Sequence, residues 1–224
     1  MSTACPAKVL YEQFAAVAKA LGSPQRLELI EHLAQGPRSV DALAGKMGLP
    51  IANVSQHLQA MRRAGLVTSE RAGKFVTYRL ADASVPAAFA AVRAVAERHS
   101  AEMERVVRGW FHDHDAMEPV SHAELAARLE DGQVTLIDVR PADEFALGHL
   151  PGAINLPLGE LETRLSGLDS GREIVAYCRG PWCVMSFEAV AALRRHGFAA
   201  RRLDGGVPEW QAAGRATEIS PDCG

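Results

Sequence analysis

The sequence predicts two domains of different fold class: a mainly α domain with one β-hairpin, and an α/β domain with a parallel sheet. Helical patterns fill residues 7–64 ahead of two β-rich runs, whereas strand and helix patterns alternate from Val134 to Leu203. The chain has 224 residues, enough for two cores. Charge also divides the chain: residues 1–110 carry 14 Lys and Arg against 9 Asp and Glu (+5), and residues 111–224 carry 10 against 18 (−8). The basic half is therefore expected to meet a polyanion.

The first domain opens with three predicted helices. Residues 7–20 carry apolar side chains at helical spacing. Ser23-Pro24 is an N-cap followed by proline at the first helical position, and Gly36-Pro37 ends that second helix. Ser39 is expected to cap a short third helix, which stops at the turn Gly48-Leu49-Pro50.

A fourth helix is predicted from Ile51 to Ala64, and one of its faces is polar. Its buried stripe is expected to comprise Ile51, Val54, Leu58 and Met61. A short helix, a glycine-containing turn and a polar-faced helix form a helix-turn-helix arrangement, although a polar face alone can simply be solvated. The candidate DNA contacts on this helix are Asn53, Ser55, Gln56, His57, Gln59, Arg62 and Arg63.

A hairpin and a long helix are predicted next. Leu66–Arg71 and Phe75–Leu80 flank the turn Ala72-Gly73-Lys74. Arg71 and Lys74 lie near the tip, where a wing contacts the phosphate backbone. One continuous helix is expected from Val85 to Trp110.

Two stretches, Leu21–Leu27 and Val54–Val67, resemble the ArsR (SmtB-like) family of winged-helix repressors. The resemblance covers about residues 7–108. It implies a homodimer paired through the first and last helices of the domain. It also implies double-stranded operator DNA as a partner, with one recognition helix in each half-site.

The resemblance also implies a possible metal site, because members of that family commonly bind metals. Ser39–Met47 contains no cysteine for a thiolate site. His99, Glu102, His112 and His114 are weak candidates for an oxygen and nitrogen zinc site. The alternative is a solvated helix face and a polar linker, so no metal or other cofactor is assigned.

The second domain is expected to span residues 120–224, after a linker at 111–119. Ser121 and Glu124 form a capping-box pattern that opens a helix through Leu129, and a buried strand follows from Val134 to Val139. Asp138 and Arg140 are interpreted as a structural ion pair near the site rather than as catalytic groups.

This domain is organised around Cys178. A strand pattern at Glu173–Tyr177 precedes it, and a helix is expected from Ser186 to His196. Loop amides, the helix start and Arg179 predict a thiol with a lowered pKa in an anion-binding loop. The alternative is an inert buried thiol. Phosphatase chemistry is disfavoured, because Val184 stands where a phosphate-binding arginine is needed, six residues after Cys178.

Three ordered motifs resemble the rhodanese (sulfurtransferase) family over about residues 118–218: Asp138–Asn155, Tyr177–Ser186 and Asp204–Trp210. The resemblance implies a Cys178 persulfide, formed from a sulfane-sulfur donor such as thiosulfate, polysulfide or a low-molecular-weight persulfide. The remaining candidate residues of the loop are Arg179, Gly180, Trp182 and Cys183. Cys183 is either a resolving thiol or a small apolar filler. A Cys178–Cys183 bond is expected to need rearrangement of the loop or of the first helical turn.

The leading function is a homodimeric repressor whose second domain senses or processes reactive or reduced sulfur, with loading expected to release DNA. One alternative is a sulfurtransferase whose front half serves dimerisation or localisation. Another is a metal(loid)-responsive repressor with a passenger rhodanese domain. Four cysteines do not form a disulfide framework, no run reaches membrane-span length and no signal peptide is evident, so a reducing cytoplasm is expected. Cys5 and Cys223 are interpreted as bystanders, and the alternative is a second-line resolving role.

Overall fold

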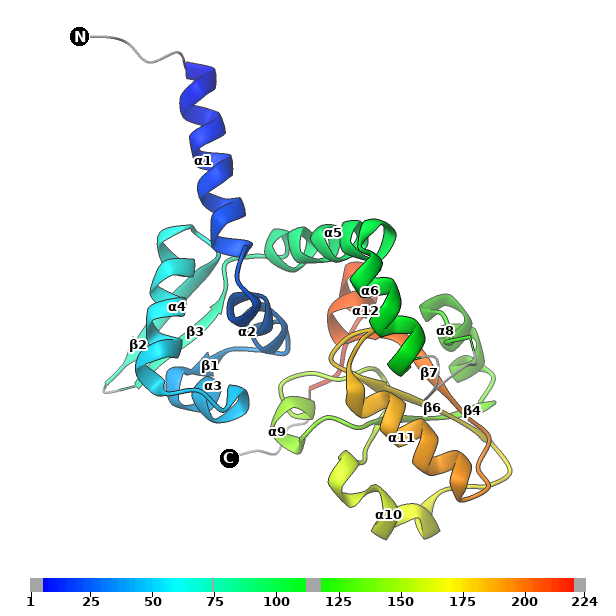
Figure 1. Cartoon of the computed structure of the whole chain (residues 1–224). Coiled ribbons are helices and arrows are strands. Elements are labelled where there is room, and N and C mark those ends of the chain that lie inside the picture. Colours follow the sequence, from blue (N-terminus) through cyan, green and yellow to red (C-terminus); the bar gives the residue numbers. More distant parts are fainter. Residues whose placement is uncertain (1–5, 74, 112–117, 220–224) are drawn as a thin grey trace, which may run out of the picture. The chain divides into compact units, whose positions relative to one another are not determined.

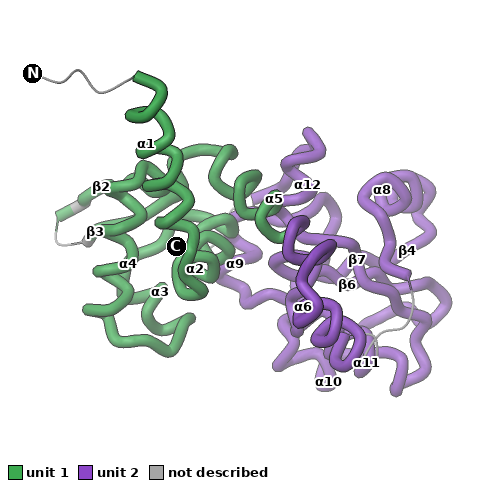
Figure 2. The backbone as a smooth tube through the Cα atoms, turned by 45° about the horizontal axis from the view of Figure 1, so that its top comes forward, with its two compact units in different colours: residues 1–93 green, residues 94–224 purple. Residues whose placement is uncertain are grey.

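The computed structural model describes residues 6–73, 75–111 and 118–219 and confirms the predicted fold classes (Figure 1). A helical winged helix-turn-helix precedes an α/β domain with a parallel sheet. The chain divides into two compact units, residues 1–93 and 94–224 (Figure 2). Among the described residues, no helix is long and apolar enough to cross a membrane.

The N-terminal unit surrounds one apolar core with helices and a small antiparallel sheet of order β1-β3-β2. Ser39 caps α3 as predicted, because its side chain accepts from the Ala42 amide at 3.2 Å. The Ser23 hydroxyl instead bonds Gln25, so only the proline half of that predicted helix start is present. The elements are α1 (Pro6–Leu21), α2 (Pro24–Ala34), β1 (Arg38–Ser39), α3 (Val40–Met47), α4 (Ile51–Arg63), β2 (Val67–Ala72) and β3 (Phe75–Leu80).

Helix α4 packs on this core through Val54, Leu58 and Met61, all fully buried as predicted. The prediction for Ile51 is wrong, since that side chain is 53% exposed. Ile51 is the first residue of α4 and directly follows Pro50. It therefore lies at the end of the helix, where the packed stripe has not yet begun.

The single long helix predicted for Val85–Trp110 is also wrong. The structure has α5 (Ser84–His99), α6 (Ala101–Val106) and a π-helix (Val107–Phe111). Ser100 adopts an extended conformation between the first two, and its side chain accepts from the Met103 amide at 3.2 Å. A serine that caps a new helix competes with continuation of the old one.

The second unit contains a four-stranded parallel sheet of order β5-β4-β6-β7. Ser121 caps the first helix after the linker, and the Glu124 carboxylate lies 3.0 Å from Arg201. The elements are α8 (His122–Glu130), β4 (Val134–Asp138), α9 (Ala142–Phe145), β5 (Ile154–Asn155), the 3-10 turns η2 (Leu158–Glu160) and η3 (Leu165–Gly167), α10 (Leu161–Arg164), β6 (Glu173–Cys178), α11 (Val184–Arg195), β7 (Ala200–Gly206) and α12 (Val207–Ala212).

Both faces of this sheet are buried, as expected for parallel strands. Alternate residues of β6 point to opposite sides: Ala176 and Cys178 join the core under α10 and α11, whereas Val175 and Tyr177 join the core under α8 and α12. Cys178 therefore lies on the α11 face of the sheet, at the carboxyl end of β6. Ligands of open α/β folds bind at the carboxyl ends of the strands.

Candidate functional site

Two cysteines bracket the loop between β6 and α11. Cys178 is the last residue of β6 and is fully buried, while Cys183 is the N-cap residue of α11. Helix α11 begins at Val184, two residues before the predicted start, which brings Cys183 to the helix terminus. Negative charge is favoured at such a terminus.

The sulfur atoms of Cys178 and Cys183 are joined as a disulfide, with Cα atoms 6.1 Å apart. This separation lies within the normal range for a disulfide. A rearrangement of the loop or of the first helical turn between the dithiol and the disulfide stays a prediction. The bond is compatible with an intact β6 and an intact α11.

The loop is held tightly by backbone contacts. The Cys183 amide donates to the Gly180 carbonyl at 3.2 Å, and both the amide and the hydroxyl of Ser186 donate to the Cys183 carbonyl, at 3.1 and 2.9 Å. Gly180 is buried, whereas Trp182 and Cys183 are partly accessible. A buried cysteine thus lies next to a second, more accessible one.

Gly206 lets the neighbouring strand approach this loop. It pairs with Cys178 across β6 and β7, beyond an irregularity in the register. A β-carbon at Gly206 would lie 2.2 Å from the Cys178 carbonyl oxygen and 2.8 Å from the carbonyl carbon and oxygen of Arg179. Those atoms are backbone and cannot rotate away, so the position requires glycine.

Arg179 pairs with a buried carboxylate on α9. Its guanidinium donates to both oxygens of Glu144, each at 2.8 Å. The Glu144 side chain is fully buried on α9. Planar, bidentate pairs of this kind are among the stronger hydrogen-bonded ion pairs, so Glu144 fixes the orientation of the guanidinium beside the loop. Glu144 was not among the predicted site residues, although its place among the acidic residues of the Asp138–Phe145 motif was a usable signal.

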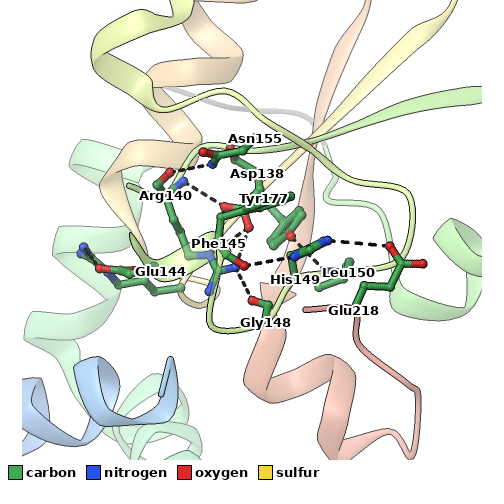
Figure 3. A network of polar contacts seen from close by, with 11 residues as sticks. Asp138, Arg140, Glu144, Phe145, Gly148, His149, Leu150, Asn155, Tyr177 and Glu218 are labelled. Atoms are coloured by element: carbon green, nitrogen blue, oxygen red, sulfur yellow. Dashed lines mark hydrogen bonds and ion pairs between the residues drawn. The ribbon is translucent and has the colours of Figure 1, made fainter. Parts of the chain in front are cut away.

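Asp138 and Arg140 form the predicted ion pair, and both side chains are fully buried (Figure 3). The Arg140 Nε atom lies 3.0 Å from each Asp138 carboxylate oxygen, and Nη2 donates to the Gly148 carbonyl at 2.8 Å. Asn155 donates to the carbonyls of Asp138 and Arg140. Burial alone lowers the pKa of Arg140, but hydrogen bonding to Asp138 and its charge outweigh burial and raise that pKa.

Tyr177 joins this network from the strand that carries Cys178 (Figure 3). Its hydroxyl accepts from the Leu150 amide at 3.0 Å. Burial, followed by the charge of Asp138, raises the pKa of Tyr177 well above its usual value. His149 stacks on Phe145, with ring centroids 3.7 Å apart. The opening motif of the domain therefore supports the strand ends and does not supply a nucleophile.

The predicted DNA contacts lie mostly on the surface of α4. Asn53, Gln56, Gln59, Arg62 and Arg63 are exposed, and Ser55 and His57 are half-buried. Arg62 donates to Ser69 on β2 at 3.3 Å, which links the helix to the wing.

The wing presents Arg71 on its surface. Arg71 is exposed, and its Nε atom donates to the Gly73 carbonyl at 3.0 Å. Lys74 lies outside the described residues. An exposed cation beside a tight turn is suited to a phosphate contact.

The two predicted metal ligands that the structure describes, His99 and Glu102, do not form a metal site. Glu102 forms an ion pair with Arg105 on α6, and His99 is exposed at the end of α5. His112 and His114 lie outside the described residues, as do Cys5 and Cys223. Within 6–73, 75–111 and 118–219, no group of three metal-ligating side chains is close enough to hold an ion.

Comparisons with known proteins match both halves. A helix-turn-helix domain family matches residues 21–70 and the rhodanese-like domain family matches residues 121–213. The HTH-type transcriptional regulator Rv0324 of Mycobacterium tuberculosis is 43% identical over 205 residues, which are 92% of this chain and 90% of that protein.

Two shorter relatives match one half each. A sulfurtransferase of Allochromatium vinosum is 35% identical over 92 residues, covering 40% of this chain and 84% of that protein. The homodimeric winged helix-turn-helix DNA-binding domain of Mb0332 from Mycobacterium bovis is 36% identical, with a TM-score of 0.41, and the match covers 46% of this chain and 94% of that one.

These findings define a DNA-binding transcriptional regulator with an attached α/β domain. The chain belongs to the ArsR-type family of winged helix-turn-helix transcriptional regulators, and its C-terminal domain is rhodanese-like.

Proposed function

We propose that this regulator is an operator-binding repressor whose Cys178–Cys183 pair processes sulfane sulfur and thereby changes operator affinity. One observation carries the proposal: a buried cysteine ends β6 and a second cysteine begins α11, with Cα atoms 6.1 Å apart. Both thiols thus belong to one loop in a chain that also bears a DNA-recognition helix.

The chemistry proceeds in two balanced steps. The Cys178 thiolate attacks the outer sulfur of thiosulfate, a Cys178 persulfide forms and sulfite leaves; with a polysulfide donor the shortened chain leaves instead. The Cys183 thiolate then attacks the Cys178 sulfur, forms the disulfide and expels hydrosulfide. The sulfane sulfur gains the two electrons that the thiols lose, and a low-molecular-weight thiol returns the loop to its reduced state by exchange.

Each part of the chain has its own role in the proposed function. Residues 1–110 bind DNA and pair with a second copy of the chain, residues 111–119 link the two domains, and residues 120–224 take up sulfur. Asn53, Gln56 and His57 are proposed to reach base edges, while Arg62, Arg63, Arg71 and Lys74 contact phosphates.

Homodimer formation is part of the proposal, and exposed apolar side chains support it. On α1, Leu10, Tyr11 and Phe14 are 56%, 71% and 62% exposed. On α5, Val92 and Val95 are 44% and 61% exposed. Several exposed apolar side chains on one helix are typical of a protein–protein interface, and a second copy that presents the same helices would bury them.

The test is an anisotropy titration of one two-fold-symmetric duplex, selected from random sequence by the full-length reduced protein. Wild type, Cys178→Ser and Cys183→Ser are compared before and after polysulfide, with bound sulfur followed by mass spectrometry. We expect wild type to lose about 5–150-fold in affinity after treatment. Cys183→Ser should keep the persulfide without forming the disulfide, and Cys178→Ser should show neither sulfur loading nor an affinity change.

Two results would contradict the proposal. A donor response that survives Cys178→Ser would place the sensor at Cys5, Cys223 or a metal, and repeating the titration with zinc separates the last case. Failure of the protein to prefer any symmetric duplex over random DNA would remove the repressor function.

A second candidate, an independent sulfurtransferase, is favoured by the 84% coverage of the Allochromatium enzyme. It predicts sulfur loading on Cys178 and transfer to an acceptor thiol with operator affinity identical in every form. The same titration therefore separates the two functions.

A further inference from the structure

The loop between the two cysteines contacts a helical segment outside the rhodanese sheet. The Trp182 indole N–H donates to Glu97 Oε1 on α5 at 2.5 Å. The Trp182 ring also packs edge-on against Phe111 of the π-helix, with centroids 5.0 Å apart. Glu97 and Phe111 belong to the same compact unit as the loop.

Phe111 also contacts the other side of the site. Its ring lies 4.7 Å from that of Phe187, and the ring of Trp110 lies 6.1 Å from Phe187. Phe187 is buried in the first turn of α11, the helix that Cys183 caps. The segment 94–111 therefore touches the loop through Trp182 and the following helix through Phe187.

The Trp182 side chain has room to move. A hollow of about 260 Å³ lies beside it, lined also by Met103, Glu104, Val107 and Arg108. Trp182 is only half-buried, and it directly precedes Cys183 in the chain. A change in the direction of the Cys183 Sγ atom would therefore displace the neighbouring Trp182 ring, and the hollow leaves space for that ring on one side.

The acceptor of this contact lies on a helix shared by both units. Helix α5 begins at Ser84, within the N-terminal unit, and ends at His99, within the C-terminal unit. Glu97 is two residues from that end. A hydrogen bond to a carboxylate is stronger than one between neutral groups, so its formation or loss has a measurable effect.

We propose that Glu97 and Phe111 are positioning residues for the sulfur-handling loop, and that Trp182 transmits the state of Cys178 and Cys183 to helix α5. The inference rests on the proposed function and specifies its route. In the disulfide form, Trp182 donates to Glu97; reduction or persulfide formation releases Cys183 and weakens that contact. By thermodynamic linkage, operator binding and disulfide formation then bias each other by the same factor.

The experiment uses the full-length protein and three variants. Trp182→Phe keeps a ring but removes the N–H donor, and Glu97→Ala removes the acceptor. Glu188→Ala is the control, since Glu188 is an exposed carboxylate on α11. The thiol–disulfide equilibrium of Cys178 and Cys183 is measured in glutathione buffers by alkylation and mass spectrometry, together with tryptophan fluorescence and the operator titration.

We expect Glu97→Ala and Trp182→Phe to shift the thiol–disulfide equilibrium constant about threefold to tenfold toward the dithiol. They should also reduce the polysulfide effect on operator affinity by a similar factor. Glu188→Ala should match wild type. Fluorescence should change on reduction in wild type and lose that change in Trp182→Phe, although Trp110 and Trp210 remain.

The inference is overturned if both variants match Glu188→Ala in equilibrium constant and operator response while Cys178 still loads in each. Failure of the proposed function gives a different result, because Cys178 would then take up no sulfur, or operator affinity would not respond, already in wild type.

Discussion

Gly206→Ala tests the close approach of strand β7 to the loop that follows Cys178. The added β-carbon would lie 2.2 Å from the carbonyl oxygen of Cys178, far inside contact distance. Its φ of −148° is ordinary extended backbone, so the cost comes from collision and not from torsional strain. Overpacking of this type costs about 1–3 kcal/mol, and because the obstructing atoms are backbone we expect the upper end, about 3 kcal/mol.

The assay is thermal unfolding of the full-length protein, followed by circular dichroism and calorimetry. For a domain of about 100 residues, 3 kcal/mol corresponds to a fall of about 12–24 °C in the transition of the C-terminal domain. Gly159→Ala is the matched control, since its β-carbon meets no atom within 4 Å. If the two variants unfold at the same temperature, β7 does not approach the loop as described.

Three further predictions concern charge. Arg179→Met removes the two hydrogen bonds that the buried Glu144 carboxylate accepts from the guanidinium and should cost about 3–5 kcal/mol, most of which the double variant with Glu144→Gln should recover in denaturant unfolding. Burial lowers the pKa of His122 in the folded state. The contribution of neutral His122 to the free energy of unfolding is therefore complete above about pH 6.5 and is lost as the pH falls through the lower folded-state pKa. Between pH 5 and 7.5 the melting temperature should rise with pH from this cause in wild type and not in His122→Gln. Arg71→Ala should weaken binding to all duplexes alike and reduce the slope of log affinity against log salt by about one unit.

Local signals in the sequence were sufficient for most of the fold. Ser39 predicts the start of α3 because a side-chain oxygen can satisfy an otherwise unpaired amide. The apolar run before Cys178 predicts β6, since a strand buried on both faces carries few polar residues. The relevant interactions span a few residues, and their patterns are therefore readable along the chain.

Long-range partners were not readable in this way. Glu144 and Arg179 are 35 residues apart, and Glu97 and Trp182 are 85 apart. The neighbouring residues in the sequence would allow each of these side chains to be solvated, so they do not indicate a partner. The partner lies far away in the sequence and comes close only when the chain folds. The sequence therefore placed Arg179 in the loop but gave no sign of its buried partner Glu144.

The charges around the loop limit how the site can stabilise an anionic sulfur. Arg140 and Arg179 are each paired with a buried carboxylate, whereas α11 begins directly after Cys183 with a helix N-terminus, where negative charge is favoured. Under the proposed function, this terminus would favour one charged sulfur, and the state of the loop would reach α5 through Trp182. A coupling of about 1–3 kcal/mol gives a 5–150-fold change in operator affinity. A typical hydrogen bond contributes about 0.5–1.5 kcal/mol, so the single solvent-exposed contact between Trp182 and Glu97 can supply the lower part of that coupling without any large movement of the sheet.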